Sequence, residues 1–166
     1  MSVDVEVCNG ADGKSSSESI LGAPKGCLEF VVYGRIMPKE RPRVVRGRVY
    51  TPKRTKDSEE NIGFAYKIAH HGKRFERGVP LRLSADFFFV GPKSSKKKAA
   101  QMLSGEIRPT KRGPGDADNL LKTVADALNG VAYEDDSQIV EVEARKYFGE
   151  EYKTVIRIEE VGVGAE

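Results

Sequence analysis

The sequence predicts one α/β domain, which can equally be termed α+β, with helices packed on a mixed β-sheet. Segments with apolar residues at alternate positions interleave with segments of helical spacing, in the order strand, helix, strand, helix, strand, strand. A chain of 166 residues suits a single compact core. No apolar run approaches the roughly 18 residues of a membrane span, so no membrane partner is expected. The predicted domain covers residues 27–160, between an N-terminal tail (1–26) and a C-terminal tail (161–166).

The N-terminal tail is rich in Gly, Ser, Ala, Asn and Asp, a composition typical of flexible segments. Valines alternate with acids over residues 3–7, which also fits a short edge strand. No positive patch precedes an apolar core, so no secretory signal is predicted. Cys8 and Cys27 have no CxxC partner and match neither a zinc site nor a disulfide framework. We therefore expect two free thiols in the cytoplasm of a bacterial or phage-infected cell.

The first strand of the domain is predicted at residues 27–34, where both faces are apolar, as expected of an inner strand. Pro38 and Pro42 then exclude both helix and central strand. Gly47 is the expected centre of a small hairpin. A basic loop of this kind is a natural contact for phosphate groups.

The first long helix is predicted from Asp57 and Glu60, which form a helix-start signature, to Gly72 at its end. His70 and His71 are adjacent, so on a helix they point about 100° apart and do not form a ligand pair. We expect both to be surface histidines. The later elements are a strand, a short basic helical segment, a flexible loop, a helix and two strands, at residues 81–90, 93–103, 104–115, 118–130, 138–147 and 152–160.

The charges are strongly segregated along the chain. Residues 35–56 carry a local charge of +8 and residues 92–113 carry +6, whereas residues 114–160 carry −7. Two basic blocks on either side of an acidic cluster fit a polyanion held around a metal site better than they fit plain solvated faces. The predicted DNA-binding residues lie in the basic blocks: Lys39, Arg41, Arg43, Arg46, Lys53, Arg54, Lys96, Lys97, Lys98, Lys111 and Arg112.

The acidic cluster has the chemistry of a divalent metal site. Asp116 and Asp118 are one residue apart where a loop enters a helix, and Asp135 and Asp136 open a later strand. Hard ions such as Mg²⁺ take oxygen ligands, and in phosphate enzymes they use a few carboxylates with water and the phosphate itself. Lys122, about one turn after Asp118, could contact a phosphate oxygen or stabilise developing charge.

Spacing alone leaves simpler interpretations of this cluster open. A calcium loop of the EF-hand type is excluded, because Leu120 and Leu121 stand at its fifth and sixth positions. Asp116 or Asp118 could merely cap the helix. Asp118, Lys122 and Asp126 also have the spacing of ordinary ion pairs on one helix stripe.

Three stretches carry a more specific pattern, D-x-D-N-x-x-K at residues 116–122, Asp-Ala-Leu-Asn-Gly at 126–130, and Tyr-Glu-Asp-Asp-Ser-Gln-Ile at 133–139. Together with residues 34–43 and 50–52, they resemble the RusA family of Holliday-junction resolvases, in its phage-type branch. The resemblance covers residues 27–160. It implies a small homodimeric, Mg²⁺-dependent endonuclease, with Mn²⁺ as a substitute, that nicks two opposing strands of a four-way DNA junction symmetrically.

The resemblance also assigns roles to residues. The metal ligands match Asp116, Asp118 and Asp136, and the catalytic lysine matches Lys122. Three further residues are carried as supporting or alternative members of the site: Asp126, Asp135 and Asn119. Two other functions use the same features, a metal-dependent nuclease for flaps, single strands or RNA, and a non-catalytic nucleic-acid binding module whose acids only cap and pair.

Overall fold

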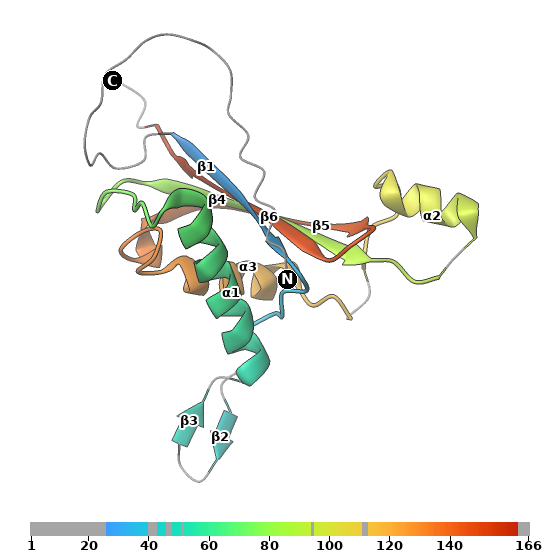
Figure 1. Ribbon diagram of the computed structural model, residues 1–166, viewed down its shortest axis with the longest axis horizontal. Coiled ribbons are helices and arrows are strands. Elements are labelled where there is room, and N and C mark those ends of the chain that lie inside the picture. The colour runs from blue at the N-terminus through green and yellow to red at the C-terminus, as the bar shows by residue number, and fades with distance from the viewer. Residues whose placement is uncertain are drawn as a thin grey trace.

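The computed structural model describes residues 26–39, 43–45, 48–50, 52–93, 95–110 and 113–162. Its elements confirm the predicted α/β domain, with three helices packed on a four-stranded mixed sheet (Figure 1). In chain order they are β1 (Cys27–Tyr33), β2 (Arg43–Val45), β3 (Arg48–Tyr50), α1 (Lys53–His70), β4 (Leu81–Val90), α2 (Lys96–Leu103), α3 (Ala117–Leu128), the 3-10 turn η1 (Asp136–Gln138), β5 (Ile139–Gly149) and β6 (Lys153–Glu160). None of the described helices is long and apolar enough to cross a membrane.

The main sheet has the strand order β1–β6–β4–β5, and β2 and β3 form the small predicted hairpin. β4 and β5 run parallel, because the chain between them passes through α2 and α3 before it returns to the sheet. β6 is antiparallel to both of its neighbours. This crossover connection contains α3 and leads into β5. The predicted acids lie at these two places, at the beginning of α3 and just before β5.

One face of the sheet forms the hydrophobic core with α1 and α3. The inward residues of β4 alternate along the strand, and five of them are buried, from Leu81 to Phe89. On the register Phe30–Ile156–Ala85, β1, β6 and β4 present buried side chains to the same side. Ile62 and Tyr66 of α1 and Leu120, Val124 and Leu128 of α3 complete the cluster.

The opposite face of the sheet carries a ladder of ion pairs. Arg82 on β4 pairs with Glu141 and Glu159 on the two flanking strands. Arg145 on β5 pairs with Asp86 and Glu143. Arg157 on β6 pairs with Glu29 on β1. We call this set of side chains the sheet ladder; opposite charges across neighbouring strands stabilise such a face.

The expectation that β1 is an inner strand was wrong within the described residues, where β1 pairs with β6 alone. Its second face is only partly covered, since Val31 is half-buried and Tyr33 is exposed. An apolar pattern reports side-chain burial, and it does not reveal which strand lies on either side. The predicted N-terminal tail and its edge strand lie outside the described residues.

The helix α1 begins at Lys53, four residues before the predicted signature at Asp57. Pro52 precedes it, and the carbonyl of Pro52 accepts hydrogen bonds from the amides of Thr55 and Lys56. The helix ends as predicted, with His71 in the left-handed region (φ 53°) before Gly72.

His70 was predicted at the surface but is half-buried. Its ring contacts those of Phe30 and Tyr66, at centroid distances of 6.0 and 5.2 Å. Burial, together with the nearby charges of Lys73 and His71, lowers the pKa of His70. This environment makes His70 a packing residue of the α1 end.

Candidate active site

The loop before α3 presents two carboxylates that the helix itself does not use. Asp116 is the N-cap residue, yet its side chain makes no capping hydrogen bond, and the carbonyl of Asp116 accepts from the amide of Leu120. Asp118 lies in the first turn and is exposed. Neither carboxylate forms an ion pair with another described residue. The simple interpretation as a helix cap therefore does not account for Asp116.

Gly115 sets the direction of this loop. It has φ +91°, a conformation that L side chains rarely adopt, and a Cβ there would lie 2.8 Å from Cγ of Pro38. Glycine is the residue that tolerates both demands. The close approach to Pro38 brings the basic 35–39 segment directly beside the beginning of α3.

Asp126 forms an ion pair with Lys39. Lys39 Nζ lies 2.7 Å from Asp126 Oδ2 and 2.5 Å from Glu59 Oε1, so one lysine joins α1 to α3. Partial burial lowers the pKa of Lys39, but the bonds to Asp126 and Glu59 outweigh it and raise the pKa overall. Among described residues Lys122 forms no ion pair with Asp118 or Asp126, so the ion-pair interpretation of that stripe is not realised.

Hydrogen bonds to its backbone fix the 36–39 segment between the two helices. The amide of Lys39 donates to the carbonyl of Asn119 (2.9 Å), and Thr123 Oγ1 donates to the carbonyl of Met37 (3.0 Å). The amide of Met37 donates to Ser58 Oγ (3.1 Å). Asn119 thus contributes its carbonyl to holding the segment in place.

Two cations that the motif analysis did not single out hold the loop from the other side. Lys146 Nζ donates to the carbonyl of Gly115 (3.0 Å), and the Arg35 guanidinium donates to the carbonyl of Gly113. Lys146 stands at an inward position of β5, between Ala144 and Phe148, opposite Phe87. A lysine in an otherwise apolar inward row is the sequence signal that could have identified it.

The second pair of acids lies at η1, and its members differ. Asp135 Oδ1 accepts from the amide of Ser137 (2.9 Å), and hydrogen bonds from the Ser137 side chain and amide together lower the pKa of Asp135. Asp136 is exposed, and its carboxylate makes no hydrogen bond or ion pair to another described residue. Asp135 therefore caps the turn, whereas the carboxylate of Asp136 is left for another partner.

The side chain of Gln138 anchors the turn that carries Asp136. The buried amide of Gln138 accepts from the amide of Glu134 (3.0 Å) and donates to the carbonyls of Glu76 (2.8 Å) and Val79 (3.3 Å). Such a buried, fully bonded amide fixes both ends of the turn.

Tyr133 connects this turn to α3. Its hydroxyl donates to the carbonyl of Ala125 (2.8 Å), and its ring is fully buried. Burial raises the pKa of Tyr133 far above its ordinary value, and the negative charges of Asp136 and Asp126 raise it further. Tyr133 therefore ties the segment that precedes Asp136 to the carbonyl of Ala125 on α3.

Comparison with known proteins identifies the family. The family description "Endodeoxyribonuclease RusA" matches residues 34–159, most of the chain. The chain belongs to the RusA endodeoxyribonuclease family. An uncharacterized protein of Bacillus subtilis (strain 168), YqaN, is 33% identical over 140 residues, which cover 81% of this chain and 97% of that protein. The crossover junction endodeoxyribonuclease rusA of Lactococcus phage r1t is 40% identical over 88 residues, covering 52% of this chain and 60% of that protein.

Nucleases of the RusA family depend on a metal ion. Within the described residues, no three His, Cys, Asp or Glu side chains converge closely enough to hold an ion by themselves, so the predicted set of Asp116, Asp118 and Asp136 is not gathered into one cluster. Mg²⁺ usually takes only one or two carboxylates, while water and substrate phosphate supply the other oxygens. The carboxylates of Asp116 and Asp118, which are exposed and have no ion-pair partner among the described residues, fit that mode of binding.

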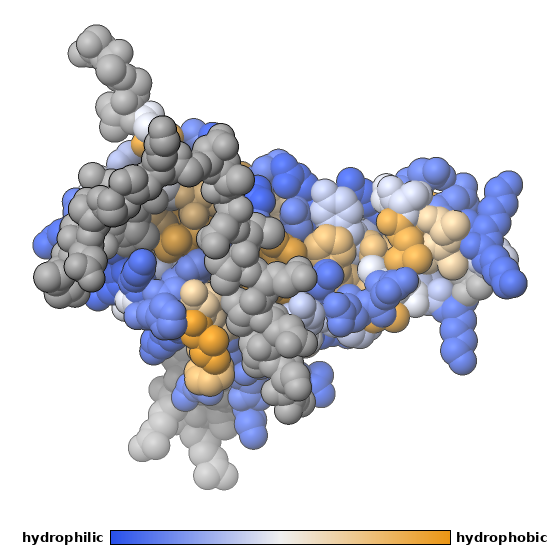
Figure 2. Space-filling model, turned by 45° about the horizontal axis from the view of Figure 1, so that its top comes forward, coloured by the Kyte–Doolittle hydropathy of each residue, from blue (hydrophilic) through white to orange (hydrophobic). Residues whose placement is uncertain are grey.

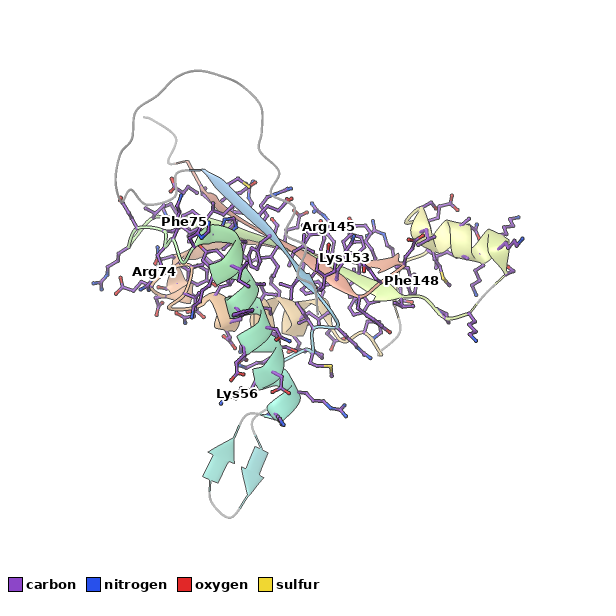
Figure 3. All side chains as sticks on the ribbon, viewed as in Figure 1. Lys56, Arg74, Phe75, Arg145, Phe148 and Lys153 are labelled. Carbon is purple, nitrogen blue, oxygen red and sulfur yellow. The ribbon has the colours of Figure 1, made fainter. Side chains whose placement is uncertain are left out.

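The predicted DNA-binding residues whose side chains are described form two groups, one on α2 and one at the beginning of α1, with Lys39 apart from both. Lys96, Lys97 and Lys98 are exposed on α2, and Lys53 and Arg54 are exposed at the beginning of α1. Figure 3 shows Lys56 at this same end of α1, next to the β2–β3 hairpin, with Arg74 and Phe75 at the opposite end. Lys39 is the exception, because its ammonium group is bound to two carboxylates. The side chains of the remaining five lie outside the described residues: Arg41, Arg43, Arg46, Lys111 and Arg112.

Proposed function

We propose that this member of the RusA family is an Mg²⁺-dependent endonuclease that resolves four-way DNA junctions by paired, symmetric nicks. The observation that carries the proposal is the pair of carboxylates at the beginning of α3, Asp116 and Asp118, which no other described residue engages. A helix end that held them only for capping or pairing would have used them. The named junction endonuclease of phage r1t supports the choice of substrate.

The ion would be held by Asp116 and Asp118. Asp136, which does not form one cluster with them among the described residues, would be the third carboxylate once ion and substrate are bound, and Mn²⁺ would substitute for Mg²⁺. When bound, the ion supplies Lewis-acid polarisation of the scissile phosphate and a water of lowered pKa. Lys122, one turn along the same face of α3, contacts a phosphate oxygen and offsets the charge that develops there. The capping bond of Asp135 supports Asp136 as the ligand of the pair.

Asp126 and Lys39 support the site without contacting the ion or the phosphate. Their ion pair, continued to Glu59, ties α3 to α1 and to the 36–39 segment. Lys39 therefore positions the helix that carries Asp118 and Lys122. We therefore propose that Lys39 positions α3 and does not mainly contact phosphate groups of the DNA.

The basic blocks grip the junction backbone. Lys96, Lys97 and Lys98 on α2, with Lys53 and Arg54 at the beginning of α1, present exposed cations to phosphate groups. Each neutralised phosphate releases counterions, so affinity falls steeply as salt rises. The DNA substrate places this activity in the cytoplasm of a bacterial or phage-infected cell.

Paired nicks on opposing strands require two active sites related by a twofold axis, and we propose a homodimer. The described edge of the sheet supports such a contact. β5 lies at the edge, and its Val140 and Val142 are 58% and 63% exposed. Exposed apolar side chains on an edge strand form a surface that another chain can cover.

The test is cleavage of a four-way junction beside a linear duplex, a flap, a single strand and RNA, each with Mg²⁺ or with EDTA. The proposal expects paired nicks in the junction only with Mg²⁺, at least about tenfold faster than in any other substrate. A selectivity below about tenfold would point to a general nuclease. Binding without cleavage of any substrate would point to a non-catalytic module.

A further inference from the structure

A cavity of about 570 Å³ lies at the end of the sheet, between β4, β5, α2 and the segment that leads to α3. Its walls include the aromatic rings of Phe89 and Phe148, with Met102 and Ile107 beside them. Figure 3 shows Phe148 at the end of the sheet nearest α2, and Figure 2 shows apolar surface at this end of the molecule among hydrophilic side chains. The cavity is therefore an apolar hollow within a hydrophilic surface.

Among the described residues that line this cavity, the charged ones are cations: Arg35, Lys98 and Arg108. Arg108 is held by the carbonyls of Gly105 (3.1 Å) and Lys146 (3.2 Å), and its guanidinium lies 3.9 Å from the centroid of the Tyr147 ring. Lys98 Nζ forms no ion pair with another described residue. The cavity thus joins an apolar interior to a cationic rim, and it suits a ligand that is flat and apolar at one end and anionic at the other.

The cavity adjoins the candidate active site through the chain itself. Gly113 and Pro114 line it, and the next residues are Gly115 and Asp116. The carbonyl of Gly113 is held by Arg35, a rim residue, and the carbonyl of Gly115 by Lys146. A group seated in the cavity would lie against the segment that aims Asp116.

We propose that this cavity receives one unpaired nucleobase of the DNA substrate, with Lys98 at the phosphate of the same nucleotide. The inference rests on the proposed nuclease function, which supplies DNA as the ligand. A nucleobase is a flat ring with a π-face, and it stacks on aromatic side chains whatever its sequence. The volume lies within the range of sites that hold small organic groups, roughly 300–1,000 Å³.

The first measurement compares two labelled nine-nucleotide single strands in EDTA, one complete and one with an abasic site at its centre. Fluorescence anisotropy gives the affinity of the full-length protein for each. The proposal expects the complete strand to bind about tenfold more tightly, which is within the range for stacking of one base. Equal affinities, or no binding of either strand, would overturn it.

Two variants locate the effect. Ile107→Trp fills the cavity and should bring the ratio of affinities close to one, with folding checked by circular dichroism. Lys98→Glu should lower the ratio to below about threefold. Lys97→Glu is the matched control, because it makes the same charge change on the same helix outside the cavity lining. It should weaken both strands equally and keep the ratio; an equal loss of ratio in both lysine variants would overturn the proposal.

The ratio of affinities and the junction-cleavage assay test the base cavity and the resolvase proposal independently. A ratio near one in a protein that cleaves junctions selectively would remove the base cavity and leave the resolvase proposal standing. A tenfold ratio that Ile107→Trp abolishes, in a protein that does not prefer junctions, would support the cavity as a base site for a different DNA substrate.

Discussion

Charged side chains crowd two surfaces of this molecule, the sheet ladder and the beginning of α3, and the two surfaces use their charges in opposite ways. On the sheet, Arg82, Arg145 and Arg157 are each paired with carboxylates of neighbouring strands. At α3, the carboxylates of Asp116 and Asp118 have no such partner among described residues. A high density of charged side chains therefore does not by itself identify a functional site. What distinguishes the two surfaces is whether the charges are satisfied within the protein.

The largest expected effect comes from Asp118→Asn, which removes a charge that no described protein group uses. We expect junction cleavage with Mg²⁺ to fall roughly a thousandfold, the upper range for loss of a group that stabilises the transition state. Junction binding in EDTA should stay within about twofold. The matched control is Glu143→Gln in the sheet ladder, which should leave cleavage unchanged. Equal losses in both variants would erase the distinction between the two surfaces.

Gln138→Ala tests the support beneath Asp136. Its side-chain amide serves the turn through Glu134, Glu76 and Val79, and loss of these buried bonds should lower the free energy of unfolding by about 1–3 kcal/mol. Urea unfolding measures this change. Gln101→Ala, on α2, is the control and should cost much less. A stable Gln138→Ala variant would mean that the turn is held by other contacts.

Lys97→Ala and Arg145→Ala compare an exposed cation that has no ion-pair partner among the described residues with a paired one. The slope of log affinity for the junction against log salt should fall by about 0.9 in Lys97→Ala, because the variant neutralises one phosphate fewer. Arg145→Ala should leave the slope unchanged and lower stability by less than about 1 kcal/mol, as for other surface ion pairs. A salt slope that changes only in Arg145→Ala would place the DNA on the sheet ladder.

The smallest expected effect concerns Asp135, which caps η1. Its pKa is lowered from 3.8 by the bonds to Ser137, so the ionised form stabilises the fold. That contribution is present above the ordinary pKa and is lost as the pH falls through 3.8 toward the lower folded value. Wild type should therefore melt at a higher temperature than Asp135→Asn at about pH 7, and the difference should shrink as the pH falls below 3.8. A difference that persists in acid would have another cause.

Much of the fold was predictable because local patterns decide local elements. β4 occupies residues 81–90 as predicted, α3 ends before Gly130, and α2 and the hairpin occur where expected. The position of β1 at the described edge was not predictable, because strand neighbours are set by contacts between distant segments. The start of α1 was missed because Pro52 begins the helix before the acidic signature.

The candidate site divides in the same way. The residue types and spacing of Asp116, Asp118 and Lys122 were readable in the sequence. The ion pairs of Lys39 with Glu59 and Asp126 were not, because they join segments far apart in the chain. The family resemblance had already favoured Asp136 over Asp135, and the capping bond to Ser137, which only the folded turn displays, adds a physical reason for that proposed choice.

The most direct test of the account is paramagnetic broadening by Mn²⁺ in the amide NMR spectrum of the full-length protein. Mn²⁺ binds the oxygen ligands that suit Mg²⁺ and broadens the signals of nearby amides. At substoichiometric Mn²⁺ the account predicts that amides of residues 116–122 and 134–138 broaden first, and that Asp118→Asn weakens this broadening. Broadening that begins at Glu141, Glu143 and Glu159 of the sheet ladder, or that ignores Asp118→Asn, would contradict it.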